Sequence, residues 1–350
     1  MIKQHKYIEL ANKLRADILN GHYAAGERLP SENELTQELG FSRQTVRQSM
    51  QLLEAEGLTE RVQGSGTYVK MFSDRVKSYN IAVITTYITD YIFPTVLSGI
   101  EQTLAEKQYR SMLASTQNRV DNERRLLEDF LEKNIDGFII EGTKTALPNP
   151  NIDLYQRINN MGLPVVFING FYQELRRSVY VISDDRQGGY EACSFLIGKG
   201  HSKIAGIFKS DDGQGLGRYA GMTSAMIENG LRVHDENVLW FTTVDQDKLI
   251  ETFALDTVQG CTAVICYNDL VAVKLIELLR ANNIRVPQDM AVISFDNSAF
   301  SDIAAVKITS LDYPKERLGS LAAEKLLNML NGIPESPTLM PWGFTEKEST

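Results

Sequence analysis

Two kinds of hydrophobic pattern divide the chain near residue 80. Before it, apolar residues recur at helical spacing, as in Tyr7, Leu10, Leu14 and Ile18, which favours short amphipathic helices. After it, apolar runs such as IAVITT at 81–86 alternate with helical stretches up to the end of the chain. The change predicts three segments: a small helical domain at 1–70, a linker at 71–80 and an α/β domain at 81–350.

The first domain carries clear helix start and stop signals. Ser31 is followed three residues later by Glu34, the spacing of a capping box in which each side chain binds a free backbone N–H. Gly40 suits the left-handed position that ends a helix. We therefore expect a short helix over 32–39.

A second helix follows directly, with Ser42 as its cap and Gly57 at its end. Its apolar residues fall on one face and its arginine and glutamine residues on the other. Arginine can donate two hydrogen bonds to guanine, and glutamine can pair with adenine, so the polar face suits a recognition helix in a DNA major groove. The inward residues are Val46, Met50 and Leu53, and the outward ones are Arg43, Gln44, Arg47, Gln48 and Gln51.

Two short strand-like runs, 58–62 and 67–69, come next and are joined by the turn Gln63-Gly64-Ser65-Gly66. The glycines supply the backbone conformations that a tight hairpin needs. Each feature alone is also typical of an ordinary capped helix, a solvated helix face or a simple turn. Their order and close spacing indicate a winged helix-turn-helix.

Residues 7–69 resemble the DNA-binding domain of GntR-type bacterial regulators, on the motifs GERLPSENEL, SRQTVRQ and GSGTYV. The resemblance implies contacts between the arginines, the wing and DNA, with the start of the first helix near the phosphate backbone. Capping alone is sufficient to explain Glu34. The predicted DNA-binding residues are Lys6, Tyr7, Arg28, Ser42, Arg43, Gln44, Thr45, Arg47, Gln63 and Gly64.

Composition and charge exclude several classes of function. A formal net charge of −9 over 350 residues argues against coating nucleic acid with bulk positive charge, so DNA binding must come from a local patch. Cys193, Cys261 and Cys266 show no disulfide or metal-ligand spacing. No stretch is apolar enough to cross a membrane or to serve as a secretion signal. We expect a cytoplasmic protein with no metal, no cofactor and no membrane partner.

In the α/β domain, the sequence predicts two successive series of alternating strands and helices. The alternation predicts two lobes with parallel sheets, approximately 81–177 with 309–334, and 178–308 with 335–350. The first series has strands at 81–86, 110–114, 137–140 and 165–168, with helices at 94–107, 121–133 and 152–161. The second has strands near 179–182, 204–208, 238–241, 262–266 and 290–295.

Polar and aromatic residues cluster just after these strands, where parallel sheets bind their ligands. Carboxylates, amides and an arginine can pair with vicinal hydroxyls, and aromatic rings can cover the apolar face of a sugar. Asn268 and Asp269 could instead cap a helix, and Asp296 could belong to an Asx turn. The predicted effector-binding residues are Tyr87, Tyr91, Phe93, Glu141, Lys144, Asn169, Asp185, Arg218, Asn268, Asp269 and Asp296.

Residues 80–350 resemble the sugar-binding half of LacI/GalR-type regulators, which share their fold with periplasmic sugar-binding proteins. The motifs DRQGGYEACSFLIGKGHSKIA, GRYAG and CYNDLVAVKLIELLRANNIRVPQDMAVISFDNS carry this resemblance, and it implies that Arg218, Asn268 and Asp296 bind the sugar. The combined architecture, with TTYITDYIFPTVLSGIE and GIFKSDDGQG, resembles the arabinose repressors of Gram-positive bacteria. Only this resemblance implies L-arabinose as the effector.

These observations predict a homodimeric repressor that reads a palindromic operator and releases it when a sugar binds. A regulator of the same architecture with another sugar, a sugar-acting enzyme and a transport binding protein are the alternatives. The sequence lacks the Ser-His-Asp order, P-loop and glycine-rich nucleotide motif that such an enzyme would use. The N-terminal DNA-binding pattern argues against transport.

Overall fold

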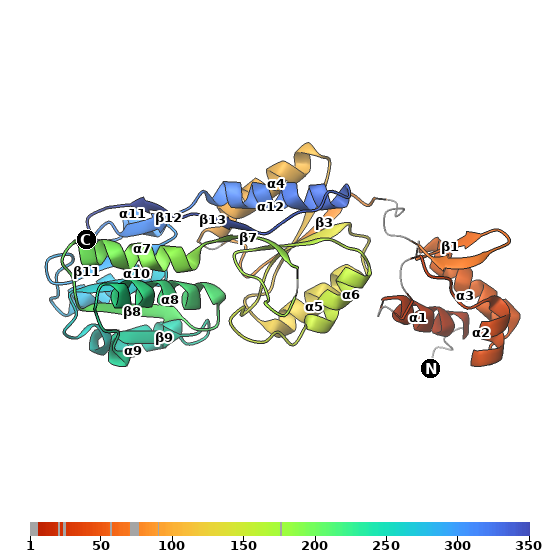
Figure 1. Ribbon diagram of the computed structural model, residues 1–350, viewed down its shortest axis with the longest axis horizontal. Helices are drawn as coiled ribbons and strands as arrows, with labels where there is room; N and C mark the ends of the chain where they lie inside the picture. Colours follow the sequence, from red (N-terminus) through yellow and green to blue (C-terminus); the bar gives the residue numbers. More distant parts are fainter. Residues whose placement is uncertain are drawn as a thin grey trace.

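The computed structural model describes residues 6–19, 22–23, 26–56, 58–70, 77–89, 91–175 and 177–350. The predicted helix end at Gly57 and most of the predicted linker lie outside these residues. Figure 1 shows a small helical domain with a two-stranded wing, followed by two α/β lobes. None of the helices in the described part of the chain combines the length and apolar character that a membrane span requires.

The small domain confirms the predicted caps. The Ser31 hydroxyl accepts a hydrogen bond from the Glu34 amide at 3.3 Å, and the Glu34 carboxylate accepts one from the Ser31 amide at 2.6 Å. Gly40 ends the helix with a φ of 69°. The elements are α1 (Lys6–Leu19), α2 (Glu32–Leu39), α3 (Arg43–Ala55), β1 (Thr59–Val62) and β2 (Gly66–Val69).

The core of this domain lies between α1 and α3. Leu10, Leu14, Val46 and Leu53 are almost fully buried, because the helical spacing of the apolar residues places them on facing sides. The Ser49 hydroxyl donates to the Tyr7 carbonyl oxygen at 2.8 Å and joins the start of α1 to α3. The small domain thus holds the predicted recognition helix, α3, on a packed base.

The first lobe contains a parallel sheet in the order β13-β7-β6-β5-β3-β4. Figure 1 shows α4 and α12 on one side of this sheet and α5 and α6 on the other. The strands are β3 (Asn80–Thr85), β4 (Arg110–Ser115), β5 (Gly137–Glu141), β6 (Val165–Ile168), β7 (Val179–Ser183) and β13 (Thr338–Met340). The helices are α4 (Phe93–Glu106), α5 (Val120–Leu131), α6 (Ile152–Asn160) and α12 (Lys315–Leu330).

The second lobe contains a sheet in the order β14-β12-β11-β10-β8-β9, parallel except for β14. Its strands are β8 (Ile204–Lys209), β9 (Val238–Phe241), β10 (Ala263–Cys266), β11 (Ala291–Phe295), β12 (Thr309–Asp312) and β14 (Gly343–Thr345). Its helices are α7 (Asp185–Gly198), α8 (Gly213–Glu228), α9 (Gln246–Val258), α10 (Asp269–Ala281) and α11 (Ala299–Ile303).

The predicted lobe boundaries are wrong at three strands. β7 and β13 pair in the first sheet and β12 pairs in the second, whereas the sequence pattern assigned each of them to the other lobe. A buried strand has the same apolar pattern in either sheet, and its partner is fixed only by long-range pairing. The chain therefore crosses between the lobes after β7, between β12 and α12, and between β13 and β14.

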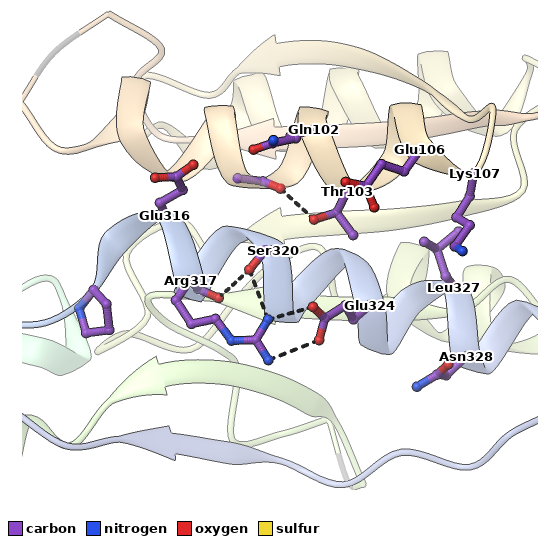
Figure 2. A pocket seen from close by; sticks show the side chains of 12 residues that line it. Gln102, Thr103, Glu106, Lys107, Glu316, Arg317, Ser320, Glu324, Leu327 and Asn328 are labelled. Atoms are coloured by element: carbon purple, nitrogen blue, oxygen red, sulfur yellow. Dashed lines mark hydrogen bonds and ion pairs between the residues drawn. The ribbon is translucent and has the colours of Figure 1, made fainter.

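The helices α4 and α12 lie side by side and approach closely through two glycines. A Cβ atom at Gly99 would lie 2.0 Å from the Glu316 carbonyl oxygen, and one at Gly319 would lie 2.0 Å from the Val96 carbonyl oxygen. Figure 2 shows the outer groove of this pair, about 800 Å³ in volume, where Arg317 donates to Glu324 and Ser320. The two helices therefore pack backbone against backbone at these glycines, with no room for a side chain.

Candidate DNA-binding and effector sites

The recognition helix α3 presents its polar face to solvent, as predicted. The Ser42 hydroxyl accepts from the Thr45 amide at 3.2 Å and fixes the first turn. Arg43, Gln44 and Arg47 are exposed on the following turns, where a major groove would meet the helix N-terminus.

Two further residues shape this face, and the sequence pattern missed both. The Glu32 carboxylate lies 3.3 Å from Arg47 Nη2 and 4.0 Å from Arg61 Nη2. Glu32 therefore links α2 to the recognition helix and to β1. Arg61 adds a second exposed guanidinium beside Arg47, and a lone arginine in a short strand gives no sequence signal of this position.

The wing brings its own predicted residues together. Gln63 and Gly64 are exposed at the hairpin tip, and Gly64 has a φ of 78°. The Leu29 amide donates to the Thr67 carbonyl oxygen at 2.9 Å, so the segment before α2 runs along the wing. Arg28 is thereby placed beside the hairpin, where a Cβ atom at Gly66 would lie 2.7 Å from Arg28 Nε. Lys6 and Tyr7 lie at the start of α1.

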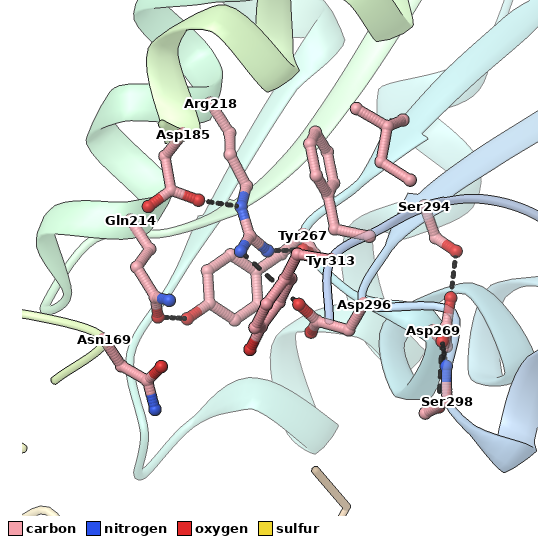
Figure 3. A network of polar contacts seen from close by, with 12 residues as sticks. Asn169, Asp185, Gln214, Arg218, Tyr267, Asp269, Ser294, Asp296, Ser298 and Tyr313 are labelled. Atoms are coloured by element: carbon pink, nitrogen blue, oxygen red, sulfur yellow. Dashed lines mark hydrogen bonds and ion pairs between the residues drawn. The ribbon is translucent and has the colours of Figure 1, made fainter. Parts of the chain in front are cut away.

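Arg218 is the centre of the second site, which lies between the two lobes (Figure 3). Its side chain is 1% exposed on α8. Nε donates to Asp185 Oδ1 at 2.9 Å, Nη1 donates to the Tyr267 carbonyl oxygen, and Nη2 lies 3.7 Å from Asp296 Oδ1. Burial opposes the charged form of Arg218, but the adjacent carboxylates outweigh it and raise its pKa above the ordinary value.

Aromatic rings surround the Arg218 guanidinium. Its Cζ atom lies 4.4 Å from the ring centroid of Phe295, 4.9 Å from that of Tyr267 and 5.3 Å from that of Trp342. These distances permit cation–π attraction and hold the planar group in one orientation. The arrangement leaves a fixed arginine beside two carboxylates, a set that can pair with vicinal hydroxyls.

Tyr91 reaches this network from the first lobe. Its hydroxyl donates to Asp296 Oδ2 at 2.8 Å and accepts from the Asp269 amide at 3.2 Å. The Asp296 carboxylate therefore points at Arg218 and Tyr91. Its backbone has a φ of 90° directly after β11, a left-handed turn that directs the side chain toward the first lobe.

The wall of the first lobe is built around Glu141. This buried carboxylate accepts from the Thr86 amide at 2.7 Å, from the Thr86 hydroxyl at 2.5 Å and from Asn169 Nδ2 at 3.3 Å. Burial raises the pKa of Glu141 to about 7, against the hydrogen bonds from Thr86. Tyr87 follows the neighbouring strand, and its ring centroid lies 6.1 Å from that of the buried Phe93. Lys144 enters this region through its backbone, with its amide donating to Asn118 Oδ1 at 2.9 Å.

Asp269 is a correction to the predicted effector site. Its buried carboxylate accepts from the hydroxyls of Ser294, Ser298 and Ser310 and from the Ser298 amide. Four donors fill the four lone-pair positions of a carboxylate, so none is left for a sugar hydroxyl. The contact predicted for Asp269 is wrong, and its carboxylate instead joins α10 to the loops after β11 and β12.

Asn268 has the structural role that the sequence left open. Its side-chain oxygen accepts from the Val271 amide at 3.0 Å and caps α10. The capping alternative is confirmed for this residue.

A cavity of about 210 Å³ separates the two walls. It brings Asn169 of the first lobe opposite Asp185, and Gln214 lines it as well. In Figure 3, Asn169 lies below Gln214 and Asp185, and Tyr313 lies close to Tyr267. Sequence reasoning missed Gln214, which lies inside the first turn of α8, and Tyr313, which follows a strand that the pattern did not assign to this site.

Tyr313 supplies an unused hydrogen-bonding group within the network around Arg218 (Figure 3). Its hydroxyl is buried and has no hydrogen-bond partner among the described residues. The ring lies 5.0 Å from Trp342, edge to face, and both residues belong to segments that cross between the lobes. A hydroxyl-bearing ligand bound beside Arg218 could satisfy this group.

Carboxylates outnumber cations around the cleft. The acidic residues of its two walls are Glu141, Asp185, Asp211, Asp212 and Asp296, and the cations paired with them are Arg218 and Lys209. Such a site disfavours a phosphorylated or carboxylated ligand and suits a neutral polyol, whose hydroxyls can donate to the carboxylates.

Comparison with known proteins agrees with this two-site organisation. Residues 6–69 match the family model of bacterial regulatory proteins of the gntR family. Residues 193–350 match the family model of periplasmic binding protein-like domains. The chain is thus a bacterial-type transcription regulator in which a gntR-family DNA-binding domain precedes a periplasmic-binding-protein-like domain.

Relatives covering nearly the whole chain specify the family. The arabinose metabolism transcriptional repressor of Geobacillus stearothermophilus is 38% identical over 332 residues, which are 93% of this chain and 91% of the relative. The protein of the same name from Halalkalibacterium halodurans is 35% identical over 335 residues, 93% of this chain and 89% of the relative. The chain belongs to the family of arabinose metabolism transcriptional repressors.

A solved structure supports the fold independently. The transcriptional regulator CelR in complex with cellobiose superposes with a TM-score of 0.70 at 21% identity, covering 92% of this chain and 100% of that chain. At this identity the likeness concerns the fold alone.

Proposed function

We propose that the protein represses arabinose-utilisation genes from the cytoplasm and that L-arabinose, bound between the two lobes, releases it from its operator. The observation that carries the sugar assignment is the fixed Arg218 between Asp185 and Asp296, where Asp185 and Asn169 both line the cavity between the lobes. This set offers paired donors and acceptors to a small neutral polyol. The family names of the relatives supply the identity of the sugar.

The direct effector contacts proposed are Asn169, Asp185, Gln214, Arg218, Asp296 and Tyr313. Tyr87, Tyr91, Phe93 and Glu141 shape the wall of the first lobe, and Lys144 positions a loop at its rim. Asn268 remains a proposed contact through Nδ2, because its cap uses only the side-chain oxygen. Asp269 is left out, because its carboxylate is occupied by donors of the protein itself.

For DNA we propose a homodimer on a palindromic operator, with one α3 helix in each half-site. Arg43, Gln44 and Arg47 read base edges, and Arg28, Gln63 and Gly64 approach the neighbouring groove. Lys6 and Tyr7 lie near the phosphates, with Ser42 and Thr45 at the helix N-terminus that meets the groove. The net charge of the whole chain, −9, makes these local contacts the source of affinity.

Release requires the sugar to change how the first lobe presents the linker. The Asp136 carboxylate accepts from the amides of Ser78 and Tyr79 at 2.9 Å each, and Lys77 Nζ donates to Asn331 Oδ1 at 3.3 Å. The end of the linker is therefore fixed to the first lobe. Closure of the lobes around sugar would shift this attachment, with a coupling of roughly 1 to 3 kcal/mol.

The test combines two measurements on the full-length chain. Thermal unfolding is followed with L-arabinose, D-arabinose, D-xylose, D-ribose, D-galactose and a phosphorylated sugar, and operator binding is then measured with and without each. A ligand at about 100 times its dissociation constant stabilises the folded state by roughly 2.7 kcal/mol. We expect a higher midpoint and weaker operator binding with L-arabinose.

Each alternative predicts a different result in this test. A response to another neutral sugar would retain the regulator and replace the effector. A response to the phosphorylated sugar alone would contradict the charge argument for the cleft. Sugar binding that leaves operator affinity unchanged would refute the release mechanism.

A further inference from the structure

Asn118 is a residue of the first lobe whose side chain binds the second lobe. It lies between β4 and α5 and is 1% exposed. Its Nδ2 donates to the Thr243 hydroxyl oxygen at 2.6 Å and to Asp212 Oδ1 at 3.4 Å, and both partners belong to the second lobe. The two hydrogens of this buried side-chain amide therefore have acceptors across the cleft.

The first lobe holds Asn118 in this orientation. Its backbone has a φ of 51°, in the left-handed region that asparagine adopts more readily than most residues. Its Oδ1 accepts from the Lys144 amide at 2.9 Å, and its own backbone amide donates to Thr116 Oγ1 at 3.2 Å. The oxygen of the side chain thus serves its own lobe, and the NH2 group serves the other.

Two further hydrogen bonds cross between the lobes in the segment that follows Lys144. The Gly213 amide at the start of α8 donates to Thr145 Oγ1 at 3.0 Å. The Ala146 amide donates to the Asp211 carbonyl oxygen at 3.4 Å. Each bond has one partner in each lobe, so all of these contacts depend on the lobes staying together.

The order of the strands places the Asn118 contact away from the hinge. The chain crosses between the lobes next to β7, β12, β13 and β14, which lie at one end of the two sheets. Asn118 follows β4 and Thr243 follows β9, and these strands lie at the other end of each sheet. A rotation about a hinge moves the far edge most, so opening of the cleft would separate Asn118 from Thr243.

We propose that Asn118 is a latch that holds the two lobes together at the edge of the cleft opposite the hinge and slows the release of a bound sugar. This positioning role rests on the sugar-binding function proposed above. It differs from the role of Arg218, which is proposed to pair with the sugar itself. Asn118 acts through Thr243 of the opposite lobe and so favours the closed arrangement.

The test measures L-arabinose affinity of the full-length chain by calorimetry, and its association and dissociation rates by stopped-flow fluorescence. Thr243→Val keeps the shape of the side chain and removes the oxygen to which Asn118 donates. Affinity should fall about three- to tenfold, the usual net effect of one hydrogen bond. The loss should come from faster dissociation, because the latch forms after the sugar has entered.

The preceding residue offers a matched control. The Thr242 hydroxyl is buried and has no hydrogen-bond partner within the described ranges of the chain. Thr242→Val is therefore the same chemical change in the same loop without the loss of a bond between the lobes. It should bind and release L-arabinose like the wild type.

A double-mutant cycle connects Thr243 to Asn118. Asn118→Gly retains the left-handed turn and removes the side-chain amide, so it should weaken binding at least as much as Thr243→Val. The two changes together should bind no more weakly than Asn118→Gly alone, because the Thr243 hydroxyl has already lost its partner. Thermal unfolding without sugar reports any loss of folding in each variant.

The outcomes distinguish this inference from the proposed function. If the wild type binds L-arabinose and Thr243→Val binds equally well, or loses affinity only through slower association, the latch is wrong. It is also wrong if Thr242→Val weakens binding as much as Thr243→Val, or if the two losses in the cycle add. If the wild type itself does not bind L-arabinose, the sugar assignment fails and this inference fails with it.

Discussion

Replacing Arg218 by methionine tests the centre of the effector site. Methionine retains much of the apolar stem that packs among the aromatic rings, so the main loss is the charge and its hydrogen bonds. Asp185 and Asp296 would remain buried without their cation. Breaking a buried pair in this way costs about 3 to 5 kcal/mol.

That cost should be visible in thermal unfolding of the full-length chain. At about 2 to 4 °C per kcal/mol for a domain of this size, Arg218→Met should lower the midpoint of the two-lobed domain by roughly 6 to 20 °C. L-arabinose should no longer raise it. Operator binding, measured by fluorescence anisotropy well below the midpoint, should persist and should no longer respond to sugar.

A second substitution separates stability from recognition. Adding Asp185→Asn to Arg218→Met removes one of the uncompensated carboxylates, so much of the lost stability should return. Sugar binding should not return, because the guanidinium that pairs with the hydroxyls is still absent. A wild-type-sized response to L-arabinose in either variant would refute the reasoning about Arg218.

Three other changes test the DNA face, the helix pair and the buried acid. Arg43→Ala should weaken operator binding by about 1 to 3 kcal/mol and relax one base preference, with L-arabinose binding unchanged; unaltered operator affinity would contradict a base contact. Gly319→Ala places a methyl group 2.0 Å from the Val96 carbonyl oxygen and should destabilise the first lobe by about 2 to 3 kcal/mol. The control Gly198→Ala, with open space around the added methyl group, should not lower stability. Because the folded-state pKa of Glu141 is raised to about 7, ionisation of this carboxyl lowers the stability of the fold as the pH rises. Glu141→Gln should therefore be more stable than the wild type by about 3 kcal/mol at pH 8, and the difference should vanish near pH 4. A stability difference that does not change with pH would exclude this cause.

Features of the small domain were predictable from sequence because their causes are local. The capping box of Ser31 and Glu34, the left-handed Gly40 and the Ser42 cap each depend on residues within one helical turn. The structure places all of them as the sequence predicts. Glu32 is different, since its link to Arg47 bridges fifteen residues of chain and depends on how two helices pack.

The positions of the strands along the chain were predictable from sequence, but the strands with which they pair were not. The apolar runs of β7 and β8 look alike, yet one pairs in each sheet. Membership of a sheet depends on contacts between distant segments, as when β13 pairs with β7. An apolar pattern reports burial and cannot report which of two similar sheets provides it.

The residues of the candidate effector site were likewise predicted only in part. Arg218, Asp185 and Asp296 were predicted and do lie together. Asp269 was misassigned, because a polar residue after a strand has the same sequence signal whether it faces the ligand or binds its own loops. Tyr313 was missed, because its position depends on a crossing between lobes that the pattern did not reveal.

The crossings also suggest a route for the proposed signal from the second lobe to the DNA-binding domain. Arg218 lies in the second lobe, while the linker ends on the first, where Lys77 contacts Asn331 just beyond α12. α12 begins directly after the crossing at Pro314, beside Tyr313 of the cleft, and its backbone packs on α4 through Gly319. One continuous helix therefore joins the hinge to the linker attachment. Under the proposed release mechanism, a change in lobe angle at the cleft would not be absorbed within so closely packed a pair, and the linker attachment would move with it.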